Sequence, residues 1–334
     1  MTKSKSISRL LKVPSAAWVI LIMVIISTLI SDKYLTLGNM INIIQQNAVL
    51  LIVALGSTLV LLSEGIDLSA GSVLTLSGVN CVIVMLKVTD AGASDATAML
   101  MGVLAGLLTG VAMGVITGGL IAIGKLPPFI ASLGTMGIGA ALALVLTNSS
   151  AIYIDNPVYV FIGQKLDRFT GISQLQYLSM PMFIAIAVFA VVWVVLYHTP
   201  FGRYIIAIGG NEPGTRLSGI NTVLWKWMIY ILAAVLAAIG GIVLAARLQA
   251  ADSSVGVGME FDAIAATILG GTSFAKGKGG IAGTILGVLV IGVARNSLNV
   301  LGVPSLWRPA ITGSVIILAI VFEVAYSKWR EGAK

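Results

Sequence analysis

A polar stretch interrupts a chain that is otherwise mostly apolar. It reads GRYIIAIGGNEPGTRLSGIN and covers residues 202–221. Asn211 is a favoured N-cap residue, the Glu and Pro that follow it suit the first turn of a helix, and Gly219 is a favoured terminator. The pattern predicts a helix of about two turns over residues 212–218. Because so short a helix is unstable alone, it must pack either on its own protein, as a connector, or on a partner, as a docking helix.

A glycine-rich run, GTSFAKGKGG at residues 271–280, superficially resembles a phosphate-binding loop. A P-loop needs a glycine, four further residues, Gly-Lys and then Ser or Thr. Here Thr272 replaces the first glycine and Gly279 follows the lysine. The same run contains the dinucleotide-like spacing of Gly277, Gly279 and Ala282, but no strand precedes it. Both matches are false, and the glycines predict a tight turn between helices. We therefore expect no ATP hydrolysis by this chain.

Other catalytic chemistry is equally poorly supported. The single histidine, His198, ends an apolar run, and the single cysteine, Cys81, has no partner for a disulfide or a metal site. No paired carboxylates lie within an apolar run, and only Glu323 comes close to the carboxylate that proton or sodium coupling would need. We expect no enzyme activity, no bound metal and no bound cofactor.

The composition predicts a membrane protein. The chain has 334 residues, of which 58% are hydrophobic and 10% are charged. Several apolar runs reach about 18 residues, enough for a helix to cross roughly 30 Å of hydrocarbon. Because unpaired backbone groups find no water there, and because the runs do not alternate as barrel strands do, the fold class is all-α and polytopic. The net charge of +7 comes from basic residues beside these runs, so we exclude nucleic acid and expect the lipid bilayer as the surrounding medium.

Apolar runs between polar breaks predict about ten transmembrane helices in one transmembrane domain, residues 14–327. A basic N-terminus, 1–13, precedes it, and a C-terminal segment, 328–334, follows. The polar stretch falls in a loop at 199–224. The predicted spans are 14–31, 41–62, 69–88, 96–124, 128–147, 178–198, 225–247, 260–274, 281–302 and 307–327.

The distribution of basic residues predicts the orientation. With the N-terminus inside, thirteen of the twenty Lys and Arg residues fall on inner segments, which favours cytoplasmic termini and a cytoplasmic loop at 199–224. These are Lys3, Lys5, Arg9, Lys12, Lys125, Arg203, Arg216, Lys226, Lys276, Lys278, Lys328, Arg330 and Lys334. The segment 260–274, about 22 Å of helix, is short for a full crossing and is a candidate half-helix. If this segment did not cross, however, the basic C-terminus would move to the outer side. We therefore favour a full crossing, whether or not its helix is broken.

One span carries glycine at every fourth position. Gly102, Gly106, Gly110, Gly114 and Gly118 form a groove that wraps slowly around the helix, because each step of four turns by only about 40°. Small residues let neighbouring backbones approach closely in lipid. The groove predicts tight packing within the chain, with a subunit interface as the alternative.

Uncharged polar side chains also occur within the spans. They can either hydrogen-bond a passing polyol or hold helices together. Both roles stay open for Gln45, Gln46 and Asn47, whereas we favour helix contacts for Asn80, Asn296 and Asn299. We expect Asp67 and Ser69 to cap the span that follows them, and Glu260 or Asp262 to cap the span at 260–274. This role is preferred to hydrogen bonding with a passing polyol.

The polar stretch resembles the cytoplasmic signature of ribose-type ABC importer permeases. Two further stretches are similar to segments of that family: EGIDLSAGS at residues 64–72 and EFDAIAATILGGTS at residues 260–273. With the span pattern, the resemblance covers essentially the whole chain. It is specific for the family but not for the sugar.

The resemblance implies a membrane subunit that pairs with a second permease, as a homodimer or a heterodimer, and binds a cytoplasmic ABC ATPase that holds ATP and Mg. A periplasmic binding protein would deliver a monosaccharide, ribose-like pentose or hexose, at the bacterial inner membrane. The family's coupling role then falls on Asn211, Glu212, Thr215, Arg216, Leu217 and Gly219. Importer permeases broadly share Glu-Ala-Ala with Gly six residues after Glu, whereas here Pro-Gly follows Glu212 and the glycine comes at seven.

Two alternatives remain at this stage. A secondary carrier or facilitator for a small polar solute would have no need of a docking helix. A branched-chain amino-acid ABC permease of related architecture would differ in the solute held by its binding protein. The sequence does not identify the sugar, the second permease subunit or the path-lining residues.

Overall fold

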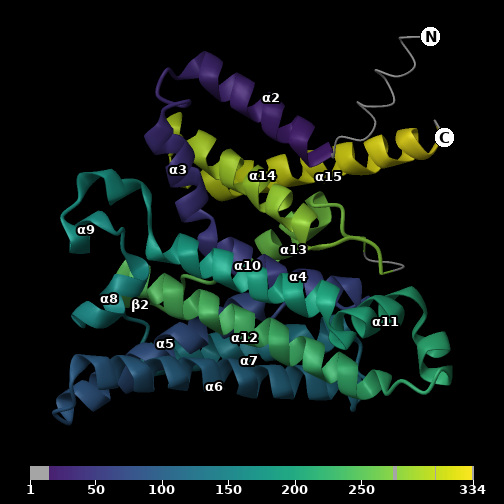
Figure 1. Ribbon diagram of the computed structural model, residues 1–334, viewed down its shortest axis with the longest axis horizontal. Coiled ribbons are helices and arrows are strands. Elements are labelled where there is room, and N and C mark those ends of the chain that lie inside the picture. The colour runs from purple at the N-terminus through teal and green to yellow at the C-terminus, as the bar shows by residue number, and fades with distance from the viewer. Residues whose placement is uncertain (1–14, 274–276, 305, 333–334) are drawn as a thin grey trace.

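The protein is a bundle of helices in a computed structural model that describes residues 15–273, 277–304 and 306–332 (Figure 1). The predicted N-terminal segment, the last two residues of the C-terminal one and Lys276 lie outside the described residues. The helices and strands are α2 (Ser15–Ile30), α3 (Leu37–Gln46), α4 (Ala48–Leu62), α5 (Ala70–Asp90), α6 (Asp95–Ala122), α7 (Pro128–Thr147), β1 (Ile152–Tyr153), α8 (Pro157–Gly163), α9 (Asp167–Thr170), the 3-10 helix η1 (Ser173–Tyr177), α10 (Met180–His198), α11 (Pro200–Leu217), α12 (Thr222–Leu248), β2 (Ala250–Ala251), α13 (Met259–Leu269), α14 (Ile281–Val300) and α15 (Arg308–Gly332).

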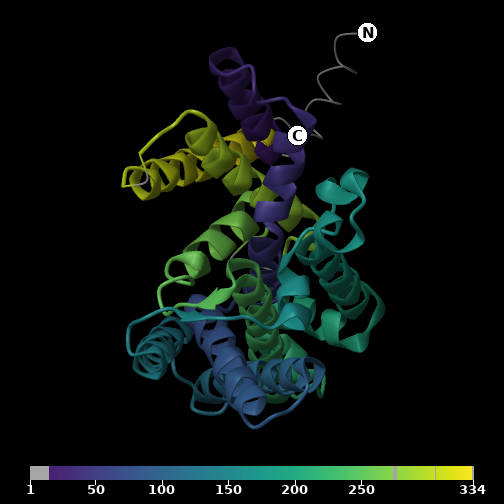
Figure 2. The same cartoon turned by 90° about the vertical axis from the view of Figure 1, so that its left-hand side faces the viewer.

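The core forms around α12, which packs against α4, α5 and α6. Most of the C-terminal half of α12 is small or aliphatic and buried, from Ala233 to Ala246. Figure 2 shows α5, α6 and α7 gathered at one edge of the molecule, and α2, α14 and α15 at the other. Leucine and isoleucine side chains on the outer faces of α2, α6, α7 and α10 are exposed, as lipid-facing surfaces require.

The all-α prediction is confirmed in the described residues, but the count of ten spans is not. Six helices, α5, α6, α7, α10, α12 and α14, are long and apolar enough to cross a membrane, and α3 with α4 makes a seventh if the bent pair is one span. Every predicted span does contain a helix. The described apolar parts of α2 and α15, Ala16–Ile30 and Ala310–Phe322, are shorter.

The span predicted at 41–62 is broken. It consists of α3 and α4, which meet at Asn47 with a bend of 44°. Asn47 leaves the helical conformation at φ −95° and ψ 2°, and its side chain donates to the Ile43 carbonyl at 2.6 Å. The side chain also packs on Gly292 of α14, where a β-carbon would lie 2.2 Å from Asn47 Nδ2. An asparagine that competes with the backbone and fills a gap on a neighbouring helix explains the break.

The segment predicted at 260–274 forms the short helix α13, which has 11 residues and is about 16 Å long. Its N-terminal end lies beside the N-terminal end of α5. A β-carbon on Gly71 would lie 2.4 Å from the Gly256 carbonyl oxygen, and one on Gly256 would lie 2.2 Å from that of Gly71. α5 and α13 therefore begin next to each other, at a point where their backbones touch. Neither Gly71 nor Gly256 has room for a side chain.

The connection between α7 and α10 is folded rather than extended. β1 pairs with β2 in a small antiparallel sheet, which joins this connection to the end of α12. Tyr159 of α8 is buried and its hydroxyl donates to the Ile242 carbonyl at 2.7 Å. Gly163 allows the end of α8 to approach α12 closely, since a β-carbon there would lie 2.2 Å from the Arg247 nitrogen. The connection thereby caps one end of the bundle, opposite α11 (Figure 1).

The glycine groove of α6 faces α5 and α12, and all five of its glycines are buried. A β-carbon at Gly102 would lie 2.6 Å from the Cys81 carbonyl of α5. At Gly110 and Gly114 the nearest atoms belong to α12, at 2.5 Å and 2.7 Å. The structure thus uses the groove for packing inside the chain.

The packing of the groove predicts that alanine has different effects on stability at two glycines of α6. Gly110→Ala places a methyl group 2.5 Å from Ala238 Cβ, whereas at Gly119 the nearest atom, Trp227 Nε1, is 3.8 Å away. Both substitutions gain up to about 1 kcal/mol of helix propensity. Overpacking should cost Gly110→Ala about 1–3 kcal/mol, so that its melting temperature in detergent falls while that of Gly119→Ala holds or rises. Equal stabilisation of the two variants would contradict the packing role.

Candidate functional site

The predicted two-turn helix exists, but as the last part of α11 rather than as a separate element. α11 runs from Pro200 to Leu217 and is interrupted at Asn211, whose φ of −166° and ψ of 88° are not helical. The Asn211 side chain accepts a hydrogen bond from the Gly214 nitrogen at 2.9 Å. Gly219 has φ +84°, a conformation that favours glycine. Asn211 therefore caps a short helix, 212–217, which we call the terminal turn.

The terminal turn is held against its own protein by two side chains. The Thr215 hydroxyl is buried and donates to the Ala207 carbonyl at 2.9 Å, across the interruption. Lys226, in the second turn of α12, forms an ion pair with Glu212. Glu212 also lies at the N-terminal end of the turn, where a negative charge interacts favourably with the helix dipole. These contacts supply the packing that a helix of this length requires.

The opposite face of the terminal turn is exposed. Leu217 is 90% exposed and stands beside Arg216 and Pro213, which are also exposed. Together with Glu212 they line an open cavity of about 610 Å³. This apolar side chain and the neighbouring guanidinium group are of the kinds that interfaces use, and the helix that carries them is held in place.

The six predicted coupling residues therefore occupy four kinds of position. Asn211 and Gly219 set the two ends of the terminal turn, and Thr215 fixes it internally. Glu212 forms the ion pair to α12 while its other side borders the cavity, and Arg216 and Leu217 present themselves outward. The structure brings all six together.

The uncharged polar residues considered for the translocation path lie in different places. Asn296 exchanges two side-chain hydrogen bonds with Asn39, at 3.0 and 2.8 Å, and so joins α14 to α3. Asn47 serves the break between α3 and α4. Gln45 and Gln46 line a cavity of about 440 Å³ beside the α7–α10 connection, whereas Asn299 lines a different one, of about 500 Å³.

Three buried acidic residues gather near the adjacent ends of α5 and α13. Asp67 accepts hydrogen bonds from the nitrogen and the hydroxyl of Ser69, at 2.8 and 2.6 Å. Glu260 accepts from the Gly258 nitrogen at 3.2 Å, and Asp262 forms an ion pair with Arg295. The expected caps are thus modified: Ser69 precedes α5 without a side-chain capping bond, Asp67 and Glu260 bond to residues two positions away, and Asp262 pairs with α14.

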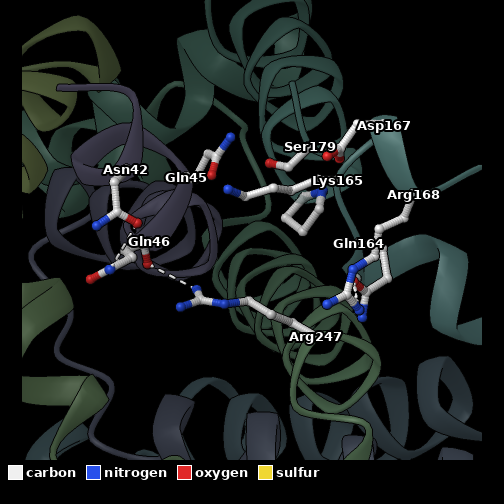
Figure 3. A pocket seen from close by; sticks show the side chains of 11 residues that line it. Asn42, Gln45, Gln46, Gln164, Lys165, Asp167, Arg168, Ser179 and Arg247 are labelled. Carbon is white, nitrogen blue, oxygen red and sulfur yellow. Dashed lines mark hydrogen bonds between the residues drawn. The ribbon is translucent and has the colours of Figure 1, made fainter. Parts of the chain in front are cut away.

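Sequence reasoning missed the residues of the α7–α10 connection. Lys165, Asp167, Arg168 and Ser179 come from a stretch that carries no recognisable motif, yet they face Gln45 and Gln46 across the 440 Å³ cavity (Figure 3). Arg247 of α12 completes this wall and donates to the Gln46 carbonyl at 3.2 Å. Only the density of charged residues between two apolar runs could have drawn attention to them. Among the described residues, no group of His, Cys, Asp or Glu side chains could hold a metal ion.

The two asparagine caps beside the terminal turn allow a matched test. Asn211 caps the turn, and Asn221 caps α12 by accepting from the Leu224 nitrogen at 3.1 Å. Losing such a cap costs about 0.5–2 kcal/mol. Asn211→Ala should speed amide hydrogen exchange at Gly214, measured by mass spectrometry, and leave the first turn of α12 protected. Asn221→Ala should do the reverse, and a rise at both sites in either variant would contradict two independent caps.

Comparison with known proteins identifies the family. The family model described as "Branched-chain amino acid transport system / permease component" matches residues 39–320. The ribose import permease protein RbsC of Escherichia coli K12 is 41% identical over 306 residues, covering 91% of each chain. RbsC of Bacillus subtilis 168 is 39% identical over 302 residues, or 90% of this chain and 89% of the relative. The D-allose transport system permease protein AlsC of Escherichia coli K12 is 34% identical over 308 residues, which cover 92% of this chain and 90% of the relative.

No solved structure matches the protein. The matched region runs from α3 to α15 and includes the terminal turn, the adjacent ends of α5 and α13, and the α7–α10 connection. The apolar helices agree with an integral membrane component. On this evidence the chain belongs to the family of ABC importer permeases that contains the ribose import permeases.

Proposed function

We propose that the chain is the transmembrane subunit of an ATP-driven importer for a monosaccharide, a ribose-like pentose or a hexose. Relatives along nine-tenths of the chain are named as ribose and allose permeases, and a fructose import permease, FruG of Bifidobacterium longum, is 31% identical over 313 residues. The resemblance at residues 202–221, 64–72 and 260–273 supports the same assignment.

The observation that carries the proposal is the shape of the terminal turn. Glu212 and Thr215 hold it to the protein from one side while Arg216 and Leu217 stand free on the other. A connector that served only its own chain would not need an exposed leucine on a braced helix. A partner that docks there and moves would transmit its motion through the Glu212–Lys226 pair to α12.

The proposed partners are those that membership of the family implies. An ABC ATPase that binds ATP and Mg would dock on the terminal turn, a periplasmic binding protein would meet the opposite end of the bundle, and a second permease subunit would complete the path. ATP hydrolysis would then occur on the ATPase alone. With this orientation, both termini would lie in the cytoplasm of a bacterial inner-membrane protein, as the bias of basic residues favours.

Two other functions remain to be separated from this one. A branched-chain amino-acid permease is suggested by the description of the family model alone. A facilitator would work without partners. Neither explains the exposed face of the terminal turn together with relatives named for sugars.

Reconstitution tests the proposed function directly. We expect uptake of labelled D-ribose, D-allose or D-fructose into proteoliposomes only when the chain is combined with its ATPase, its binding protein and ATP. Uptake of branched-chain amino acids in the same system would favour the amino-acid permease. Sugar uptake by the chain alone, without ATP, would favour the facilitator.

The docking face makes a sharper prediction. The double variant Arg216→Ala/Leu217→Ala should lower ATP-dependent uptake more than about tenfold and reduce the ATPase that co-purifies, since it removes an apolar and a guanidinium contact from one surface. Affinity of the binding protein for its sugar should not change. Ser218→Ala, at the neighbouring exposed position, is the control and should transport normally. Normal uptake by the double variant would refute docking at this face.

A further inference from the structure

A polar cavity lies at the end of the bundle remote from α11. It lies between the C-terminal part of α3, the segment 163–181 and the end of α12, and we call it the α3–α12 cavity. Its volume of about 440 Å³ falls within the range of small-molecule sites. Figure 3 shows the side chains of α3 on one side, those of residues 164–179 on the other and Arg247 below them. Amide, hydroxyl, carboxylate and cationic groups dominate its wall.

Ser179 lies in this wall with an unused hydroxyl group. The residue precedes α10 at the N-cap position, where serine normally accepts a hydrogen bond from the first turn, yet it makes no such bond. It is only 5% exposed, and its Oγ finds no hydrogen-bond partner in the described part of the chain. Leaving a buried hydroxyl unpaired costs free energy, and because this one lines a cavity, a partner from outside the chain can reach it.

Asp167 places a second unpaired atom in the same wall. Its Oδ1 is buried and has no partner within the described residues. A carboxylate oxygen can only accept, so the missing group must be a donor. The cavity thus offers an acceptor at Asp167 and, at Ser179, a hydroxyl that can donate or accept.

The charges of the wall decide between two kinds of ligand. Three basic residues face a single carboxylate: Lys165, Arg168 and Arg247 against Asp167. This excess of positive charge would by itself suit an anion. Arg168 is engaged with Gln164 at 3.0 Å, however, and Arg247 donates to the Gln46 carbonyl at 3.2 Å. A simple anion has no donor for Asp167, whereas the hydroxyl groups of a polyol can donate to Asp167 and accept from the cationic groups and the amides.

We propose that the α3–α12 cavity is a binding site for an uncharged polyhydroxy solute, a monosaccharide, at the end of the permease where solute enters. The identity of the solute rests on the proposed function. The site deepens that function because it adds Lys165, Asp167, Ser179 and Arg247 to Gln45 and Gln46. It lies at the far end of α12 from the terminal turn, roughly 40 Å along a helix of 27 residues.

Binding of sugar to the permease alone tests the site. Titration of D-ribose, D-allose and D-fructose against the purified chain in nanodiscs, followed by saturation-transfer NMR, should show saturable binding of at least one of them. Ser179→Ala should weaken that binding about 3- to 10-fold, as expected for the loss of one hydrogen bond, and Asp167→Asn should weaken it by a similar factor because a neutral acceptor replaces a charged one.

Ser77→Ala is the matched control. Ser77 also has a buried hydroxyl without a described partner, but it lies in α5 against Gly106 of α6 and lines no part of this cavity. Removing either hydroxyl should leave the melting temperature unchanged or raised, because an unpaired polar group is lost. Only Ser179→Ala should weaken sugar binding, so a defect in packing is distinguished from loss of a ligand contact.

Several results would overturn the site. Equal sugar binding by the wild type and both cavity variants would do so, as would binding of phosphate or acetate without any sugar. If none of the three sugars binds while the reconstituted transporter imports one of them, the site is wrong and the proposed function stands. If the complete transporter imports none of them, the proposed function fails first and the site falls with it.

Discussion

Backbone contact along α12 is the interaction on which the rest of the structure depends. In lipid, burying apolar surface does not drive helices together, so close approach of small residues has to supply the packing. A β-carbon at Gly241 would lie 1.9 Å from the Leu74 carbonyl of α5, and Gly110 and Gly114 bring α6 against α12 in the same way. Because these helices touch at their backbones, α12 is fixed along most of its length and can hold features at both of its ends.

The two ends of α12 carry the two candidate sites. Near its start, Lys226 pairs with Glu212 and steadies the terminal turn. Near its end, Arg247 bonds to the Gln46 carbonyl, next to the break between α3 and α4, and closes the α3–α12 cavity. The two basic residues are separated by roughly 31 Å of helix. The proposed docking surface and the polar cavity thus lie at the two ends of one rigid element, an arrangement that would suit mechanical coupling across a membrane.

Features that depend on residues close together in the sequence could be predicted. Asn211 and Gly219 bound the terminal turn as their residue types indicate, and the glycines of α6 face neighbouring helices as their spacing indicates. Features that depend on neighbours could not be predicted. The Asn47 break needs Gly292 on α14, and the pairing of Asn296 with Asn39 joins residues 257 positions apart. The run of ten spans was inferred from apolar length, which cannot tell a crossing helix from a short one such as α13.

Composition and periodicity by themselves determined that this protein is a helical membrane protein, because hydrocarbon leaves no other way to satisfy the backbone of long apolar runs. The sequence also determined the position and the ends of the terminal turn, because capping depends on residues three positions apart. Only the tertiary structure decided which polar residues meet. Gln45, Asp167, Ser179 and Arg247 come from four separate segments and share a cavity because the α7–α10 connection folds back onto the end of α12, a contact set by Tyr159 and the small Gly163.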